Sequence, residues 1–312
     1  MNPTELLLEE IRPVAFAIAY RMLGTVSDTE DLVQEALLRL HRALASGERI
    51  DSPRAFVATV TTRLAIDHLR SARVQRERYV GEWLPEPIVT DGQGDPARQT
   101  EMADSLSMAM LVLLESLSPE QRAVLLLRDV FDYGYTEIAR IVGKSEDNVR
   151  QLATRARRHV EERRPRFTTS RQQRDELARR FFAAAREGDL AALEALLAHD
   201  VELTGDGGGK VPALAQVLRG RSRVARTLHN WIKQGLRIPG ASLRQAEVNG
   251  DPGALLLDAH GRLVGVWALE IAGGQIRALR SIVNPDKLEH LGPVADIGSL
   301  LSARRDRRSG DR

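Results

Sequence analysis

Two short helices joined by a glycine turn are predicted by the stretch Tyr135-Thr-Glu-Ile-Ala-Arg-Ile-Val-Gly-Lys-Ser-Glu-Asp-Asn-Val-Arg-Gln-Leu-Ala-Thr-Arg-Ala-Arg-Arg158. Thr136 is placed to cap the first helix and Ser145 the second, because small polar side chains satisfy the amides that a helix start leaves open. Gly143 supplies the turn between them. Apolar residues recur at helical spacing in both segments. The pattern is typical of a DNA-binding helix-turn-helix.

The second of these helices leaves a basic and polar face outside its apolar side. Such side chains can read base edges or hold phosphates, so we expect the arginines to hold phosphates and the amide and hydroxyl groups to read bases. A solvated amphipathic helix would explain an arbitrary basic helix, but the predicted caps and turn favour DNA. The candidate DNA-binding residues here are Ser145, Asn148, Arg150, Gln151, Thr154, Arg155, Arg157 and Arg158.

Composition predicts an intracellular protein of two or three domains. The chain has 312 residues, a net charge of +2 and no cysteine, which excludes disulfides and thiolate metal sites. No apolar run is long enough to cross a bilayer and no basic signal-peptide flank is present, so we expect a soluble, cytoplasmic protein. The seven histidines are scattered without metal-ligand spacing, and we expect neither a metal nor a cofactor.

Charge is unevenly distributed along the chain. Residues 5–35 carry seven acidic and two basic side chains, whereas residues 139–172 carry ten basic and four acidic ones. Ordinary surface variation would explain either patch alone. Together, an acidic front and a basic centre indicate surfaces for a protein partner and for a nucleic acid.

The front half is predicted to be helical. One helix ends before Gly24, with Pro13 expected to kink or restart it, and a second follows the capping-box spacing Ser27-Asp-Thr-Glu30. A third begins at Pro53 and carries a basic stripe that could hold DNA, although a solvated face would explain it equally well. The side chains predicted to lie off the core are Asp31, Gln34, Glu35 and Leu38 in the second helix, and Arg63, Asp67, Arg70 and Arg73 in the third.

These segments resemble bacterial extracytoplasmic-function sigma factors over about half of the chain. Asp31-Leu-Val-Gln-Glu-Ala-Leu-Leu-Arg-Leu40 is similar to the family's polymerase-binding helix, and Thr62-Arg-Leu-Ala-Ile-Asp-His-Leu-Arg70 to its promoter-melting segment. Leu117-Ser-Pro-Glu-Gln-Arg-Ala-Val-Leu125 resembles the start of the second sigma domain. The resemblance implies binding to core RNA polymerase, capture of the opened minus-ten strand and duplex binding at the minus-thirty-five element. Many members have asparagine where this chain has Arg63.

Residues 81–104 are turn-rich and predict a linker. Trp83 and Leu84 within it would gain by packing, either on another domain or as a local anchor. The pattern changes near Asp175, where helices are followed by the apolar runs Ala241–Val248, Ala254–Asp258, Leu263–Ile271 and Gln275–Val283, separated by hairpin signals. We expect an α+β domain with a curved antiparallel sheet around a helix layer.

This back half resembles the SnoaL-like domain, a cone-shaped fold, and three motifs resemble those of sigma factors with a fused SnoaL-like extension. The resemblance implies an internal regulator in place of a separate anti-sigma factor, with the linker motif touching the last motif. Lys210 stands where many members have arginine, which would lose a bidentate contact. The residues of this expected regulatory contact are Trp83, Leu84, Pro85, Glu86 and Pro87; Asp206, Gly207, Gly208, Gly209 and Lys210; and Asn284, Pro285, Asp286, Lys287 and Leu288.

The sequence also leaves four other functions to consider. The Asp206–Lys210 glycines suggest a phosphate loop, but Thr204 and Val211 occupy positions that need glycine and a hydroxyl residue. Catalysis would require a pocket acid and base; the residues to inspect are Asp206, His229, Trp231, Asp258 and Trp267. A small-molecule sensor would need a cavity, and a cone filled with side chains would remove that hypothesis. A one-component DNA-binding regulator would share the helix-turn-helix but not explain the helices before it.

The sequence therefore predicts two all-α sigma domains followed by an α+β SnoaL-like domain, with no enzymatic activity. The expected partners are core RNA polymerase and promoter DNA, with a ligand left open and neither a membrane nor a separate anti-sigma factor expected. The predicted segments are 1–80 for polymerase and minus-ten binding, 81–104 as linker, 105–166 for the helix-turn-helix domain, 167–174 as linker, 175–290 for the regulatory domain and 291–312 as a disordered tail.

Overall fold

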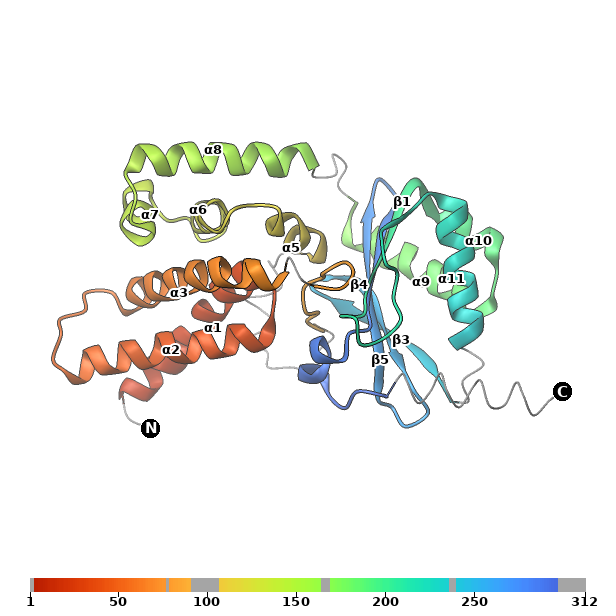
Figure 1. Ribbon diagram of the computed structural model, residues 1–312, viewed down its shortest axis with the longest axis horizontal. Coiled ribbons are helices and arrows are strands. Elements are labelled where there is room, and N and C mark those ends of the chain that lie inside the picture. Colours follow the sequence, from red (N-terminus) through yellow and green to blue (C-terminus); the bar gives the residue numbers. More distant parts are fainter. Residues whose placement is uncertain (1–2, 77–78, 91–106, 164–168, 236–239, 297–312) are drawn as a thin grey trace. The chain divides into compact units, whose positions relative to one another are not determined.

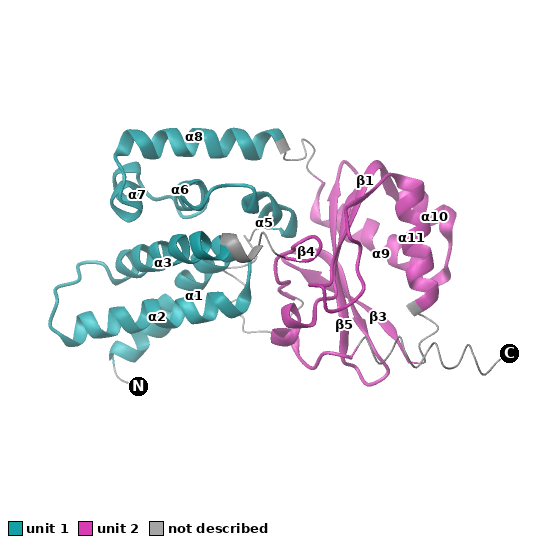
Figure 2. Ribbon diagram, viewed as in Figure 1, with its two compact units in different colours: residues 1–78, 94–164 teal, residues 79–93, 165–312 magenta. Residues whose placement is uncertain are grey.

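The computed structural model describes residues 3–76, 79–90, 107–163, 169–235 and 240–296 (Figure 1). The chain forms two compact units, one of residues 1–78 and 94–164 and the other of residues 79–93 and 165–312 (Figure 2). Residues 79–90 of the predicted linker region thus pack within the C-terminal unit. Much of the remaining linker and residues 297–312 of the predicted tail lie outside the described residues.

Three helices form the first group of the N-terminal unit: α1 (Pro3–Leu23), α2 (Val26–Ala45) and α3 (Pro53–Arg76). They pack on one another through buried side chains such as Ile18 and Leu40. Two sequence expectations are corrected here. α1 runs through Pro13 as one helix, and α2 begins after Thr25 rather than at Ser27. No helix in the described ranges has an apolar stretch long enough to cross a membrane.

Four further helices complete this unit: α5 (Met108–Glu115), α6 (Pro119–Asp129), α7 (Tyr135–Val142) and α8 (Glu146–Arg163). Ser118 and Gln121 form a reciprocal capping box at the start of α6. Gly143 ends α7 in the left-handed conformation, with φ of 66°, which glycine adopts without steric cost. The core joining α6, α7 and α8 consists of Val124, Leu127, Ile138, Ile141, Val149 and Ala153.

The two helical groups of the N-terminal unit contact each other. α6 packs against both α1 and α3, and α7 packs against α3. The two helices expected to bind opened DNA and duplex DNA therefore belong to one compact unit, joined by contacts that the next subsection describes.

The C-terminal unit consists of helices on one face of a six-stranded sheet (Figure 1). Phe181, Phe182, Leu228, Trp267 and Leu279 are buried in the core between them. The strand order is β2-β1-β6-β5-β4-β3. The elements are α9 (Arg171–Glu187), α10 (Leu190–Leu196), β1 (Leu197–Asp206), β2 (Leu218–Arg219), α11 (Arg221–Gly235), β3 (Ser242–Val248), β4 (Asp251–Leu257), β5 (Leu263–Ala272), β6 (Gln275–Ile282), η1 (Pro285–Lys287) and η2 (Glu289–Leu291).

The α+β class and the hairpin series β3 to β6 agree with the sequence prediction, but the sheet is not wholly antiparallel. β1 pairs with β6 in parallel, while the β3–β4, β4–β5 and β5–β6 pairs are antiparallel. The first strand predicted from the sequence starts at Ala241, so β1 was not predicted. Register shifts in three of the pairs interrupt the ladder, as bulges that bend a sheet do. The first residues of the predicted tail are ordered. The Leu263 amide donates a hydrogen bond to Pro293 O, and the Ala295 amide donates one to Leu263 O.

Candidate nucleic-acid interface and docked strap

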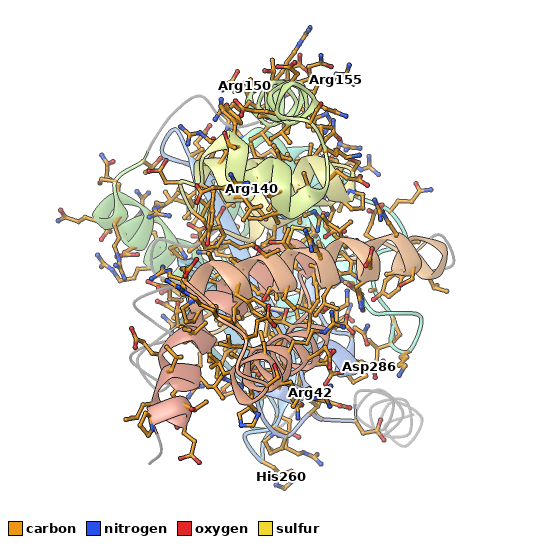
Figure 3. All side chains as sticks on the ribbon, turned by 90° about the vertical axis from the view of Figure 1, so that its left-hand side faces the viewer. Arg42, Arg140, Arg150, Arg155, His260 and Asp286 are labelled. Carbon is orange, nitrogen blue, oxygen red and sulfur yellow. The ribbon has the colours of Figure 1, made fainter. Side chains whose placement is uncertain are left out.

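The outer face of α8 carries the side chains that the sequence analysis assigned to DNA. Asn148, Gln151, Thr154 and Arg155 are exposed, while Val149 and Ala153 are buried on the opposite side. Arg150 and Arg155 project from the outside of this helix (Figure 3). The amphipathic pattern therefore presents a polar and basic surface of the kind that can contact a duplex.

The caps of the helix-turn-helix differ from the prediction at one end. Ser145 Oγ accepts a hydrogen bond from the Asn148 amide at 3.4 Å, as expected for the start of α8. α7, however, starts after Gly134, whose amide donates to Glu137 Oε2 at 2.9 Å. Thr136 is already inside α7 and donates its hydroxyl to Glu146 at 2.7 Å. Its role is to link the two helices rather than to cap the first.

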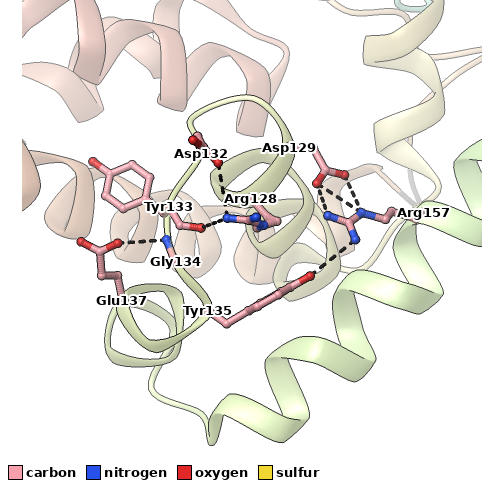
Figure 4. A network of polar contacts seen from close by, with 8 residues as sticks. All are labelled: Arg128, Asp129, Asp132, Tyr133, Gly134, Tyr135, Glu137 and Arg157. Carbon is pink, nitrogen blue, oxygen red and sulfur yellow. Dashed lines mark hydrogen bonds and ion pairs between the residues drawn. The ribbon is translucent and has the colours of Figure 1, made fainter.

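Arg157 is held inside the helix-turn-helix (Figure 4). Its guanidinium donates to both carboxylate oxygens of Asp129, with Nε to Oδ2 at 2.9 Å, and Nη1 lies 3.4 Å from the Tyr135 hydroxyl. The hydrogen bonds to Asp129 raise the pKa of Arg157. In the free chain this arginine ties α8 to the end of α6, and its phosphate contact stays a prediction. Asp129 was not predicted as a partner, because the spacing of acidic residues gives no local signal for such a contact.

Tyr135 is surrounded by arginines on α6 and α8. The Arg150 guanidinium lies 4.3 Å and that of Arg128 5.2 Å from its ring centroid, distances that allow cation–π attraction. Arg150 also pairs with Glu146 at 2.6 Å. Hydrogen bonds from Thr136 and then from Arg150 lower the pKa of the Glu146 carboxyl. Arg150 is therefore positioned before any DNA is present.

On α3, the side chains predicted to contact the opened strand lie toward the second helical group. Arg63 donates to the backbone carbonyls of Ile141 and Arg140 at 2.9 and 2.8 Å. Arg70 pairs with Glu120 on α6 at 2.6 Å, and its pKa is raised first by that hydrogen bond. Asp67 is exposed and lies 3.3 Å from Arg70. Arg73 falls on α3, but its side chain lies outside the described residues.

The predicted polymerase-binding residues form an outward face of α2. Asp31 and Gln34 are exposed, and Leu38 is 39% exposed, which is unusual for a leucine beside a well-packed core. Glu35 pairs with Arg39 at 2.7 Å on the helix surface. An exposed apolar residue amid acidic and polar ones fits a protein-binding surface.

A segment that we call the strap, residues 79–90, is docked on the C-terminal unit. At its far end Val89 pairs with Val248 in an antiparallel bridge. The Thr90 amide donates to Glu247 O at 2.9 Å, and the Asn249 amide donates to Ile88 O at 2.8 Å. The strap thus extends the sheet beside β3 and covers its edge, where unpaired backbone groups would otherwise remain.

The near end of the strap surrounds a buried carboxylate. Asp206, at the end of β1, is 0% exposed and accepts from the Leu84 amide at 2.8 Å, from Lys287 Nζ at 2.7 Å and from the Tyr79 hydroxyl. Lys287 also donates to Leu84 O, and its ammonium lies 4.1 Å from the Trp83 ring centroid. The buried negative charge is therefore compensated by an ammonium and by strap donors, as burial of an ion requires.

The three sequence motifs meet at this carboxylate. Burial, followed by the hydrogen bond to Asp206, raises the pKa of the Tyr79 phenol. Asn284 donates to the Tyr79 hydroxyl at 2.9 Å, and Lys210 pairs with Asp286 at 2.6 Å between exposed groups. Leu84, Pro85, Glu86, Pro87 and Leu288 are buried around them. The sequence analysis singled out the three motifs but missed Tyr79, which precedes the quoted linker motif.

The glycines after Asp206 allow this arrangement. Gly208 has φ of +60°, and a Cβ there would lie 2.4 Å from Asn284 Nδ2. Its amide donates to Asp206 Oδ1 at 3.1 Å. A Cβ on Gly207 would lie 2.3 Å from Val211 O. The glycine run is thus explained by a tight turn against Asn284 and not by phosphate binding.

The residues considered for catalysis do not form one site. Asp258 is tied in the β4–β5 turn, where it accepts from the amides of His260 and Arg262, each at 2.9 Å. Trp267 is buried in the core, with its indole donating to Ser281. His229 and Trp231 lie on α11, and Asp206 belongs to the strap contact. Buried apolar side chains form a core between helices and sheet, and no group of metal-ligating residues occurs in the described part of the chain.

Comparison with known proteins agrees with this layout. Residues 7–74 match the family described as Sigma-70 region 2, and residues 107–160 match Sigma-70, region 4. The ECF RNA polymerase sigma factor SigJ of Mycobacterium tuberculosis is 37% identical over 97% of this chain and 96% of the relative. A protein described as probable ECF RNA polymerase sigma factor SigI, from the same species, is 35% identical over 88% of this chain and 91% of its own length.

A solved structure extends the likeness to the fold of the whole chain. The crystal structure of the Mycobacterium tuberculosis extracytoplasmic function sigma factor SigJ has a TM-score of 0.75 and 36% identity, covering 92% of this chain and 98% of the other. The likeness thus extends over most of the chain, beyond the two matched sigma regions.

Proposed function

Because the chain belongs to the extracytoplasmic-function family of RNA polymerase sigma factors, which direct promoter-specific initiation of transcription, we propose that its C-terminal unit modulates that activity through the strap. The observation that carries the proposal is the buried contact at Asp206. A segment between the two matched sigma regions is held on the C-terminal unit by hydrogen bonds to the buried Asp206–Lys287 pair and by a β-bridge to Val248.

The covalent position of the strap is what makes modulation physically reasonable. The strap lies between the region 2 match, which ends at residue 74, and the region 4 match, which begins at residue 107. When the strap is docked, its residues are held in one conformation. Fewer flexible residues then remain to set the separation of the two regions. A docked and a released strap therefore differ in how easily both regions can engage one polymerase and one promoter.

Within the sigma family assignment we propose the following roles. Residues 1–80 bind core polymerase through Asp31, Gln34, Glu35 and Leu38 and capture the opened minus-ten strand, while residues 105–166 bind the minus-thirty-five duplex through α8. The exposure of Asp31, Gln34 and Leu38 on α2 and of the polar side chains on α8 supports these roles. Arg157 is the exception, because its ion pair with Asp129 favours a structural role.

We further propose that the chain works in the cytoplasm, performs no chemistry of its own and needs no separate anti-sigma factor. The support for the last two points is that the residues considered for catalysis do not form one site and that the strap contact is made within one chain. The one-component regulator that the sequence left open is not favoured, because the likeness to sigma factors covers nearly the whole chain.

Replacement of the strap tryptophan tests the modulation. The expected result for Trp83→Ala is an altered transcript yield from several promoters in a reconstituted reaction with core polymerase and pooled genomic DNA, because the ring that stacks on Lys287 is lost. Glu82→Ala, the neighbouring change, serves as the control. Equal yields from wild type, Trp83→Ala and Glu82→Ala at every promoter would contradict modulation through the strap, provided that circular dichroism shows all three folded.

A further inference from the structure

Arg63 caps the C-terminal end of the first helix of the helix-turn-helix. The amides of Gly143 and Lys144 both donate to Ala139 O, which leaves the next two carbonyls of α7 without those backbone partners. Arg63 reaches across from α3 and donates Nη2 to Arg140 O at 2.8 Å and Nε to Ile141 O at 2.9 Å. One guanidinium therefore satisfies two carbonyls that the helix end leaves open.

The chemistry of this cap is specific for an arginine. The rigid fork of a guanidinium can donate to two adjacent acceptors at once, and its positive charge is favourable at the negative end of a helix dipole. The same carbonyl oxygens would repel a phosphate brought to this guanidinium. Arg63 can therefore hold α7 or contact the DNA backbone, but the two arrangements compete.

A second arginine, from the helix-turn-helix group, caps a helix of the first helical group. Arg122 on α6 is 3% exposed and donates to Met22 O, in the last turn of α1, at 2.5 Å. It also pairs with Glu115 at 2.7 Å. Each helical group thus supplies an arginine that caps a helix of the other, and the Arg70–Glu120 pair adds a third fastening.

We propose that Arg63 is a positioning residue that fastens the helix-turn-helix to α3 in the free chain, and that promoter binding requires this fastening to open. The promoter-binding consequence rests on the proposed roles of α3 and α8. The fastening itself is a property of the free N-terminal unit and does not depend on polymerase or on the strap. It explains why an exposed side chain on the expected minus-ten face donates to two backbone carbonyls of α7.

Distance measurement in the free full-length chain tests the proposal. The chain has no cysteine, so spin labels can be placed at Glu48→Cys and Asp147→Cys, two exposed positions on the two helical groups. We expect double electron–electron resonance to give one narrow distance distribution for the parent. Arg63→Met should add a longer-distance population at least threefold larger than any in the parent, and Arg63→Lys should lie between them because an ammonium retains the charge but not the fork.

Arg42→Met, an exposed arginine change on α2, is the matched control and should reproduce the parent distribution. An unchanged distribution in Arg63→Met would overturn the proposal. If Arg63→Met loses helical circular dichroism, Arg63→Lys decides in the same way, since it keeps the charge but cannot donate to both carbonyls at once, and a parent-like distribution would then overturn the proposal. Because no polymerase is present, failure of this test is distinct from failure of the proposed function, which would appear as absence of binding to core polymerase.

Discussion

Neutralising Lys287 is predicted to release the near end of the strap. Asp206 is fully buried, and Lys287 is the cation that pairs with it. Removing one partner of a buried ion pair costs about 3–5 kcal/mol, because the remaining charge stays buried without compensation. The least costly response is for Tyr79 to Leu84 to leave Asp206, so that water reaches the carboxylate.

The same reasoning limits how far the release extends. Backbone and side-chain hydrogen bonds hold Ile88 and Thr90 to the β3–β4 hairpin, and each contributes about 0.5–1.5 kcal/mol. They do not involve Asp206, so the far end should stay docked while the near end opens. A cost of about 3–5 kcal/mol corresponds to a loss of protection for the Leu84 amide of roughly a hundredfold to several thousandfold, since each 1.4 kcal/mol is a factor of ten.

Hydrogen exchange followed by mass spectrometry measures this loss in peptides that span residues 79–90. The matched control is Lys210→Met, because Lys210 and Asp286 are each 55% exposed and an exposed pair contributes only about 0–1 kcal/mol. Asp206→Asn combined with Lys287→Met should recover part of the protection, because no charge is then left buried. Equal protection of the Leu84 amide in Lys287→Met and Lys210→Met would refute the argument.

Two further predictions concern the same contact. Gly208→Ala should lower the free energy of unfolding by about 1–3 kcal/mol more than Gly274→Ala in denaturant titrations, because both residues have positive φ but only Gly208 lies against Asn284; equal losses would show that the close approach costs nothing. Since the pKa of Tyr79 is raised, its contribution to stability should be present below about pH 10 and decline at higher pH, where the unfolded phenol ionises first. Wild type should therefore lose more stability than Tyr79→Phe between pH 9 and pH 11, and parallel curves would contradict this.

Local sequence patterns were sufficient for the helix-turn-helix and for the hairpins. Apolar spacing and Gly143 predict α7 and α8, because helix periodicity and a left-handed cap act within a few residues. The hairpin turns likewise predict β3 to β6 with small errors in their bounds. The α7 cap lies at Gly134 rather than at Thr136, because Glu137, three residues after Gly134, accepts a hydrogen bond from the Gly134 amide.

Contacts between distant residues could not be predicted from the pattern. The parallel β1–β6 pair joins Leu203 to Leu279, and no turn signal specifies such a partner. Arg63 and Arg157 looked like DNA contacts because both are basic and lie on outward helix faces, whereas tertiary packing supplies carbonyl and carboxylate acceptors for them. The resemblance to a family indicated that the strap motif meets the last motif, but the buried Asp206–Lys287 pair and Tyr79 emerge only from the structure.

The affinity of the full-length chain for purified core RNA polymerase, measured by fluorescence anisotropy for wild type, Lys287→Met and Lys210→Met, tests the modulation most directly. The account predicts binding by all three, with the Kd of Lys287→Met changed by about tenfold or more and that of Lys210→Met unchanged. Tighter binding by Lys287→Met would make the docked strap inhibitory, and weaker binding would make it a helper. The same Kd for all three proteins, with the strap of Lys287→Met shown to be released, would contradict the claim that the C-terminal unit acts through the strap.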